Sequence, residues 1–288
     1  MRIASLFGQN KTVLSFEVFP PKKTGPIEII YNTLDELKGL HPDFISVTYG
    51  AGGKSYDTAT CDIASCIKHK YGIEPLAHLT SVNDTKQEVE QVLTRLKENG
   101  IENILALRGD INPDIEPKNQ FKNASDLVAF IKEFGGFNIS AACYPEGHVN
   151  AGSLDEDIEY LKRKVDAGVQ HLISQLFFDN HLFYNFLDKA RAKGISVPIE
   201  AGIMPVINKA QIERMVTLCG ASLPSKFTKM MQRFENSPDA LRDAGIAYAV
   251  DQIVDLISQG VDGIHLYTMN RPYVAKKISE SISGLIHA

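Results

Sequence analysis

A glutamate lies inside an apolar run near the amino end of the chain. Glu17 belongs to the segment 13–19, which a pair of prolines ends. Strand alternation places Leu14, Phe16 and Val18 on one face and Glu17 on the other. A carboxylate that loses hydration in such surroundings stays partly protonated near neutrality, which is the property of a general acid. The alternative is a structural glutamate in a salt bridge or on an edge strand, so the surrounding residues decide between the two.

Hydrogen-bonding side chains stand at the ends of nearly all the expected strands. The set consists of Glu17, Thr48, Tyr49, His78, Arg108, Asp110, Tyr144, Gln175, Tyr267 and Arg271. Alone, His78 is equally consistent with a core histidine, and Tyr144 with an aromatic residue at a barrel rim. The amide of Gln175 has apolar neighbours and needs hydrogen-bond partners there. Together, a ring of polar strand ends favours a ligand site.

The phase of alternation indicates which residues share a face with these strand ends. Every second residue over 104–110 shares one face, as does every second residue over 76–80 and over 263–267. These faces mix small and polar side chains. We therefore expect them to line the ligand site.

Short β-branched segments alternate with amphipathic helical segments along the whole chain. Strands are expected at 13–18, 43–48, 75–79, 103–108, 138–143, 170–176, 198–202 and 263–267. Helices are expected at 26–39, 56–70, 84–98, 124–133, 154–167, 180–193, 208–219, 238–258 and 271–283. This alternation predicts an α/β fold, a (β/α)8 TIM barrel whose strand ends carry the site. An extra helical segment over 224–238 precedes the last strand, and residues 1–288 are expected to form a single domain.

The composition is typical of a protein that binds small molecules. The chain has 288 residues and a formal net charge of −5, which argues against nonspecific nucleic-acid binding. No apolar run approaches the roughly 20 residues that span a bilayer, and no export signal is recognisable, so we expect a cytoplasmic protein away from membranes. Cys61, Cys66, Cys143 and Cys219 are expected to be free thiols. No residue spacing predicts a metal site.

The common nucleotide-binding loops are missing from the sequence. It contains neither Gly-x-Gly-x-x-Gly after a strand nor a P-loop. A bound nucleotide would therefore use the barrel loops. Candidate phosphate ligands are Arg108, His148, Arg163 and Lys164. The basic segment 161–164 is equally consistent with a solvated helix face.

Short segments that run in order along almost the whole chain carry a resemblance to a known family. They are 15–21, 46–50, 77–80, 106–110, 144–148, 161–168, 175–179, 202–206 and 267–271. With them the chain resembles the methylenetetrahydrofolate reductase family, in its bacterial form made of the catalytic barrel alone. The resemblance implies an FAD-dependent enzyme that reduces 5,10-methylenetetrahydrofolate to 5-methyltetrahydrofolate. NADH or NADPH would reduce the flavin and leave, and the folate would then take its place and receive the hydride.

The resemblance also implies a role for individual residues. Glu17 would protonate a folate nitrogen and open the five-membered ring, and Asp110 would bind the folate and tune the flavin. Substrate-binding residues would be Thr48, Asp110, Gln175, Gln211 and Arg271. Cofactor-binding residues would be Tyr49, Ala51, His78, Arg108, Gly109, Asp110, Asn123, Ala124, Tyr144, His148, Ala151, Asp157, Tyr160, Arg163 and Lys164.

Two positions depart from the family pattern. Met215 stands where some relatives have an aromatic residue, and Asn123 where a tyrosine is frequent, so ligand packing is expected to differ there. No long C-terminal regulatory region follows the barrel, so regulation by S-adenosylmethionine is not expected. The outer helices leave room for assembly, and we expect a homo-oligomer.

Two alternative functions fit the same residues. One is the same folate chemistry with electrons from ferredoxin or a partner subunit. The other is a flavin- or folate-binding protein without turnover. An aldolase or lyase barrel would need a lysine at a strand end for a Schiff base, and the strand ends named above contain none.

Overall fold

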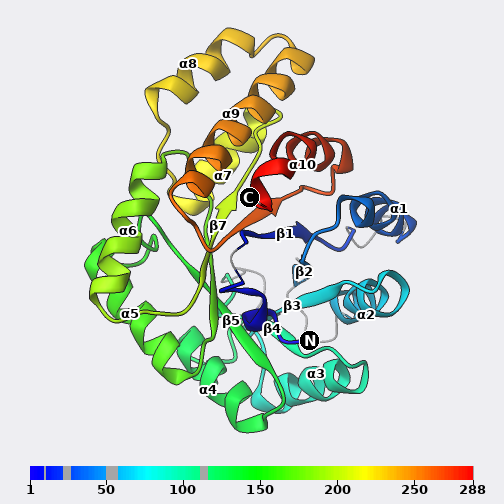
Figure 1. Ribbon diagram of the computed structural model, residues 1–288. Coiled ribbons are helices and arrows are strands. Elements are labelled where there is room, and N and C mark those ends of the chain that lie inside the picture. Colours follow the sequence, from blue (N-terminus) through cyan, green and yellow to red (C-terminus); the bar gives the residue numbers. More distant parts are fainter. Residues whose placement is uncertain (10, 22–26, 50–57, 111–115, 288) are drawn as a thin grey trace.

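The strands of the protein form a closed barrel. The computed structural model describes residues 1–9, 11–21, 27–49, 58–110 and 116–287. The strands are β1 (Val13–Val18), β2 (Phe44–Val47), β3 (Glu74–Thr80), β4 (Asn103–Leu107), β5 (Asn138–Cys143), β6 (His171–Ser174), β7 (Ile199–Ile203) and β8 (Gly263–Tyr267). They pair in parallel and in chain order, and β8 returns to β1 (Figure 1). The predicted (β/α)8 barrel is confirmed.

Helices surround the barrel on its outer side (Figure 1). They are α1 (Glu28–Leu37), α2 (Ala59–Tyr71), α3 (Lys86–Glu98), α4 (Ala124–Phe134), α5 (Leu154–Ala167), α6 (Asn180–Ala192), α7 (Lys209–Cys219), α8 (Ser225–Phe234), α9 (Pro238–Ser258) and α10 (Pro272–Ile286). Two 3-10 helices, η1 (Ile3–Leu6) and η2 (Lys38–Leu40), complete the described elements. None of these helices combines the length and the apolar character needed to cross a membrane.

The helical segment predicted before the last strand is confirmed as α8. Phe227 of α8 is fully buried, because its ring stacks on Phe178 at 4.6 Å and meets Tyr248 of α9 edge-on at 5.0 Å. These contacts fasten the inserted helix to α9 and to the loop after β6.

Capping residues explain where α3 and α5 begin and where α5 ends. The Thr85 hydroxyl accepts the N–H of Glu88, and the Glu88 carboxylate accepts the N–H of Thr85 at 2.7 Å, which is a capping box. Ser153 caps α5 by accepting the N–H of Glu156. Gly168, with φ of 137°, ends α5 in a conformation that favours glycine.

The main core lies between the strands and the helices. Leu14, Phe16 and Val18 belong to this layer, so Glu17 points into the barrel, as alternation predicted. The predicted phase of β4 is wrong. Ile104 and Ala106 belong to the outer layer, whereas Leu105 packs inside the barrel. Both faces of β4 are apolar, so polarity does not show which face points into the barrel. The predicted phase depended on Arg108 and Asp110, which lie beyond the end of the strand at Leu107.

A short N-terminal segment closes the end of the barrel at which the strands begin. This segment was not predicted from the sequence. Ile3 and Leu6 of η1 pack with Phe44 and Leu76 inside the strand ring. The N–H of Ile3 donates to Oδ1 of Asn103 at 2.8 Å. Figure 1 shows this dark blue segment across the centre of the ring. The opposite end, where the strands finish, holds the polar residues.

Candidate active site

Glu17 points inward near the end of β1. Its side chain is 18% exposed, and its Oε2 lies 3.6 Å from Nε2 of His78 and 3.7 Å from Nε2 of His265. Burial lowers the pKa of His78 to about 4, although the charge of Glu17 opposes this in part. His78 is therefore neutral near pH 7, and it gives no support to the salt-bridge alternative for Glu17.

His265 joins Glu17 to a buried chain of polar groups. The Ser15 hydroxyl donates to Oε1 of Glu200 at 2.9 Å, and its oxygen lies 2.6 Å from Nδ1 of His265. Because Ser15 has a single hydroxyl hydrogen, Nδ1 of His265 must supply the hydrogen of the second bond. In a neutral imidazole Nε2 is then an acceptor, and it is the atom that faces Glu17.

The polar chain continues to the far wall of the barrel. Oε2 of Glu200 lies 2.9 Å from Nε2 of His171, and Nδ1 of His171 lies 2.9 Å from the Ser140 hydroxyl. Ser15, Ser140, His171 and Glu200 are all fully buried. Glu200 and His171 are not among the residues predicted from the sequence. The signal was a second carboxylate in an apolar strand, the pattern that had drawn attention to Glu17.

Tyr267 and Gly202 shape the wall beside Glu17. The Tyr267 hydroxyl donates to the carbonyl of Ser174 at 2.8 Å, and burial raises the pKa of Tyr267 well above its ordinary value. Gly202 packs against both residues, since a Cβ there would lie 2.2 Å from the Ser174 carbonyl oxygen and 2.9 Å from the Tyr267 ring. A larger residue at position 202 would displace the wall.

A second polar cluster lies at the ends of β5 and α5. Lys164 donates to the carbonyl of Ala142 at 2.6 Å, and its Nζ lies 5.9 Å from the centre of the Tyr144 ring. The rings of Tyr144 and His148 meet edge-on at 4.7 Å. Burial raises the pKa of Asp157, and the charges of Lys164 and His148 oppose this rise. Burial also lowers the pKa of Lys164. The structure thus brings four predicted cofactor-binding residues together.

The segment after β4 borders this cluster. The Arg108 carbonyl accepts two N–H groups from the loop after β3, at 3.1 and 2.8 Å. Gly109 has φ of 86°, and a Cβ there would lie 3.0 Å from Cβ of Thr80. Burial raises the pKa of Tyr144, Asp110 adds to this rise, and Arg108 opposes it. Both charged residues are therefore within electrostatic reach of the second cluster, although Asp110 itself is exposed.

The predicted substrate-binding residues differ in what they contact. Gln211 in α7 has both amide atoms buried without a hydrogen-bond partner among the described residues. Such a group costs about 1–3 kcal/mol unless a ligand satisfies it. Gln175 is partly satisfied, because its Oε1 accepts the N–H of Leu176 at 2.9 Å. Thr48 is half-buried, and Arg271 is exposed at the start of α10.

Other predicted cofactor-binding residues lie at the margins. Tyr49 is half-buried and packs against the outer core layer. Asn123 and Ala124 begin α4, and the N–H of Ala151 donates to the His148 carbonyl at 2.8 Å. Ala51 lies outside the described residues.

Two further predicted residues lie on the exposed side of α5. The guanidinium of Arg163 lies 5.2 Å from the centre of the Tyr160 ring, and both side chains are exposed. The structure does not bury them with Lys164. Met215, the departure in α7, packs against the apolar cluster that also contacts Tyr267.

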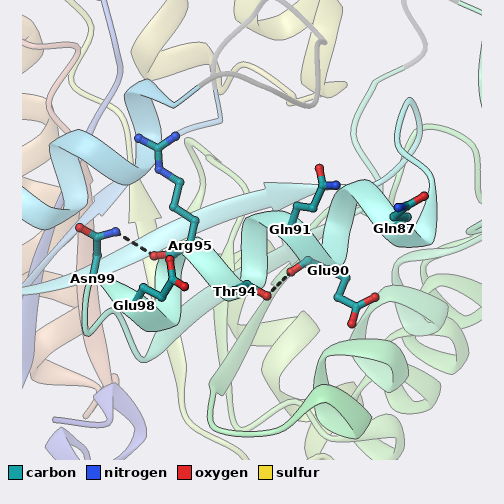
Figure 2. A pocket seen from close by; sticks show the side chains of 7 residues that line it. All are labelled: Gln87, Glu90, Gln91, Thr94, Arg95, Glu98 and Asn99. Carbon is teal, nitrogen blue, oxygen red and sulfur yellow. Dashed lines mark hydrogen bonds between the residues drawn. The ribbon is translucent and has the colours of Figure 1, made fainter.

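A shallow hollow on the outer face of α3 is unrelated to these clusters. Figure 2 shows it lined by Gln87, Glu90, Gln91, Thr94, Arg95, Glu98 and Asn99. All come from α3 and its C-terminal end, on the outside of the barrel. Its dashed hydrogen bonds, from Thr94 to the Glu90 carbonyl and from Asn99 to the Arg95 carbonyl, stay within one helix. Within the described ranges, no three His, Cys, Asp or Glu residues are grouped to hold a metal ion.

Comparisons with known proteins agree on one family. The family model described as methylenetetrahydrofolate reductase matches residues 2–283. A 5,10-methylenetetrahydrofolate reductase of Escherichia coli (strain K12) is 36% identical, with 95% of this chain and 92% of that protein covered. A relative from Arabidopsis thaliana, methylenetetrahydrofolate reductase (NADH) 1, is 34% identical, with 93% of this chain and 48% of that protein covered.

A solved structure shares the fold. It is an uncharacterized protein from Clostridium thermocellum that binds two copies of 5-methyl-5,6,7,8-tetrahydrofolic acid, with a TM-score of 0.64, 14% identity and 96% of each chain covered. At that identity the likeness concerns the fold alone.

Proposed function

The chain belongs to the methylenetetrahydrofolate reductase family of oxidoreductases, and from that premise we propose that it reduces 5,10-methylenetetrahydrofolate to 5-methyltetrahydrofolate with FAD and NADH or NADPH. The name of the Arabidopsis relative specifies NADH, which supports a nicotinamide donor. Bound FAD would supply the hydride relay from the nicotinamide to the folate. The protein must hold both ligands and provide one proton.

The donor set at the mouth fits a non-covalent FAD. Lys164 and Arg108 offer cations for its phosphates or flavin oxygens. His78 has a buried Nε2 without a hydrogen-bond partner among the described residues, so a ligand atom there would satisfy it. Tyr144 and His148 present an aromatic and a polar surface beside Lys164.

Glu17 is the proposed acid. Reduction requires the five-membered ring of the folate to open, and protonation of a ring nitrogen favours this opening. The Glu17 side chain is 18% exposed, so it is accessible from the mouth while His78 and His265 border it on the inside. The Tyr267 hydroxyl is committed to the Ser174 carbonyl and retains its proton. Among these inward-facing groups, Glu17 therefore supplies the proton.

Gln211 is the proposed folate contact. Its amide, which has no hydrogen-bond partner in the part of the chain that the structure describes, offers a donor and an acceptor together, as a pterin or a benzamide group requires. Arg271 at the start of α10 would add a cation for the acidic end of the folate.

One observation carries the proposal: a carboxyl group at the barrel mouth faces a neutral histidine and not a cation. The test is an anaerobic experiment with FAD-loaded protein. NADH or NADPH should bleach the flavin absorption, and added methylenetetrahydrofolate should restore it with formation of 5-methyltetrahydrofolate.

Each alternative function gives a different result. Absence of bleaching with either nucleotide, together with folate-dependent reoxidation after dithionite reduction, would point to ferredoxin or a partner subunit as the electron source. Reoxidation at an unchanged rate after folate addition would leave a binding protein without turnover.

A further inference from the structure

The turn after β8 holds the end of β1. The two strands are parallel neighbours (Figure 1). In their register Glu17 lies opposite Tyr267. One residue further on, the Thr268 hydroxyl donates to the Glu17 carbonyl at 2.6 Å, and the N–H of Thr268 reaches the same oxygen at 3.4 Å. Thr268 is 2% exposed. A side chain therefore extends the contact between the strands at the residue that carries the proposed acid.

Asn270 forms a second contact with β1. Its Oδ1 accepts the N–H of Phe19 at 3.1 Å, and its Nδ2 donates to the Phe19 carbonyl at 2.8 Å. The N–H of Asn270 also donates to the Thr268 hydroxyl at 3.2 Å. The turn thus contacts the backbone at Glu17 and at Phe19, on both sides of Val18.

The backbone of this turn is strained. Met269 and Asn270 both have φ of 52°, in the left-handed region. That region costs most residues roughly 1–2 kcal/mol, and asparagine tolerates it better than methionine does. Two such residues in succession persist because the surrounding contacts hold them. Their effect is to bring the Asn270 amide against Phe19.

We propose that Thr268, Met269 and Asn270 form a positioning clamp that fixes the Glu17 carboxyl relative to bound folate. Arg271 follows the clamp directly and begins α10, so the same turn fixes the acid and a proposed folate-binding cation. The inference rests on the proposed function of Glu17. A displacement of about 1 Å can cost about a hundredfold in rate, and the clamp prevents such a displacement. Thr268 and Asn270 act through Glu17 and are positioning residues.

The kinetic test uses FAD-loaded protein and separates two half-reactions. In Asn270→Ala, folate-dependent reoxidation of reduced flavin should slow by about tenfold to a hundredfold, while flavin reduction by the nicotinamide stays within about twofold. Thr268→Val, which removes the hydroxyl at nearly constant volume, should act in the same direction. Thr268→Ser, which keeps the hydroxyl, should retain the parent rate of folate-dependent reoxidation.

Asn180→Ala is the matched control. Its amide also joins two elements, donating to the Gln252 carbonyl at 3.0 Å and to Asp255 at 2.7 Å, but between α6 and α9 on the outside of the barrel. It should leave the ratio of the two half-reactions at the parent value even if stability falls.

Hydrogen exchange tests the clamp independently of activity. In protein without ligands, the Phe19 amide should exchange faster in Asn270→Ala than in the parent. It should stay protected in Asn270→Asp, which keeps an acceptor for that N–H. Unchanged Phe19 exchange in Asn270→Ala would overturn the clamp, and so would an equal slowing of both half-reactions. If the parent itself never oxidises its flavin with the folate, the proposed function fails, while the exchange result still decides whether the clamp exists.

Discussion

Oε2 of Glu17 lies 3.6 Å from Nε2 of His78, a histidine whose pKa is lowered by burial to about 4. Near neutral pH the carboxyl group therefore faces an uncharged ring. This relationship has two consequences. The proposed acid meets no cation at His78 that would favour its charged form, and the stability of the fold depends on pH through His78.

The pH dependence of stability tests the burial of His78. An unfolded histidine has a pKa of about 6.5, whereas the folded value is about 4, so between these values the unfolded chain binds a proton that the folded chain excludes. Unfolding free energy should be fully present above pH 6.5 and should fall as the pH drops towards 4, by about 3 kcal/mol from this group. Urea denaturation of the parent and of His78→Gln at several pH values measures the difference.

The groups that face His78 are Glu17 and His265, and both remain in His78→Gln. The variant should lose less stability than the parent over this pH window. The exposed His287 provides the matched control, and His287→Gln should keep the parent pH profile. Identical profiles for the parent and His78→Gln would contradict a buried, neutral His78.

Replacement of Gln211 should raise the stability of the ligand-free protein and weaken folate binding. Replacing its amide in Gln211→Met should stabilise the ligand-free protein by about 1 kcal/mol, because this removes a buried polar group that has no hydrogen-bond partner among the described residues. The same change should raise the KM for the folate by about tenfold, the loss of one or two hydrogen bonds. Thermal unfolding and steady-state kinetics measure the two effects.

Gln252→Met is the comparison for Gln211. The Gln252 amide donates to the Phe177 carbonyl at 3.2 Å and to Asn180 at 3.1 Å, so its loss should destabilise the protein and leave the folate KM unchanged. A Gln211→Met protein that is less stable and binds folate normally would refute the assignment of Gln211.

The buried Glu200 should be a determinant of stability. Glu200→Ala removes the carboxylate that both His171 and Ser15 contact inside the barrel and should cost about 3–5 kcal/mol. Glu200→Gln should cost less, because its amide oxygen can still accept from Ser15. Urea midpoints compare both with Glu235→Ala, which removes an exposed ion pair to Lys209 and should leave the midpoint unchanged. A mild effect of Glu200→Ala would contradict a stabilising contact of Glu200 with Ser15 and His171.

Local sequence patterns predicted the inward direction of Glu17 because its neighbours on β1 differ in polarity. Leu14, Phe16 and Val18 face the helices, and the contrast with Glu17 identified the phase. The same reasoning failed on β4, where Ile104 and Leu105 are both apolar although they face opposite sides. Alternation gives a phase only where the two faces of a strand have different environments.

Contacts between residues that are far apart in the chain could not be predicted from local sequence patterns. Ser15 and Glu200 are 185 residues apart, yet their side chains meet inside the barrel at 2.9 Å. The clamp likewise joins Asn270 to Phe19 across 251 residues. The register of β8 with both β7 and β1 brings Ser15 close to Glu200, and the turn after β8 brings Asn270 to Phe19. No local pattern encodes that register. The N-terminal helix η1 was not predicted for the same reason, because its packing partners lie on strands that are distant from it in the chain.

The most direct test of the account is Glu17→Gln, which keeps the shape of the side chain and removes the acid. In FAD-loaded protein under anaerobic conditions, NADH or NADPH should reduce the flavin within about twofold of the parent rate, while folate-dependent reoxidation should fall by about a hundredfold or more, the usual contribution of a general acid. Equal loss of both half-reactions, or retention of folate reduction, would contradict the claim that Glu17 supplies the proton to the folate alone.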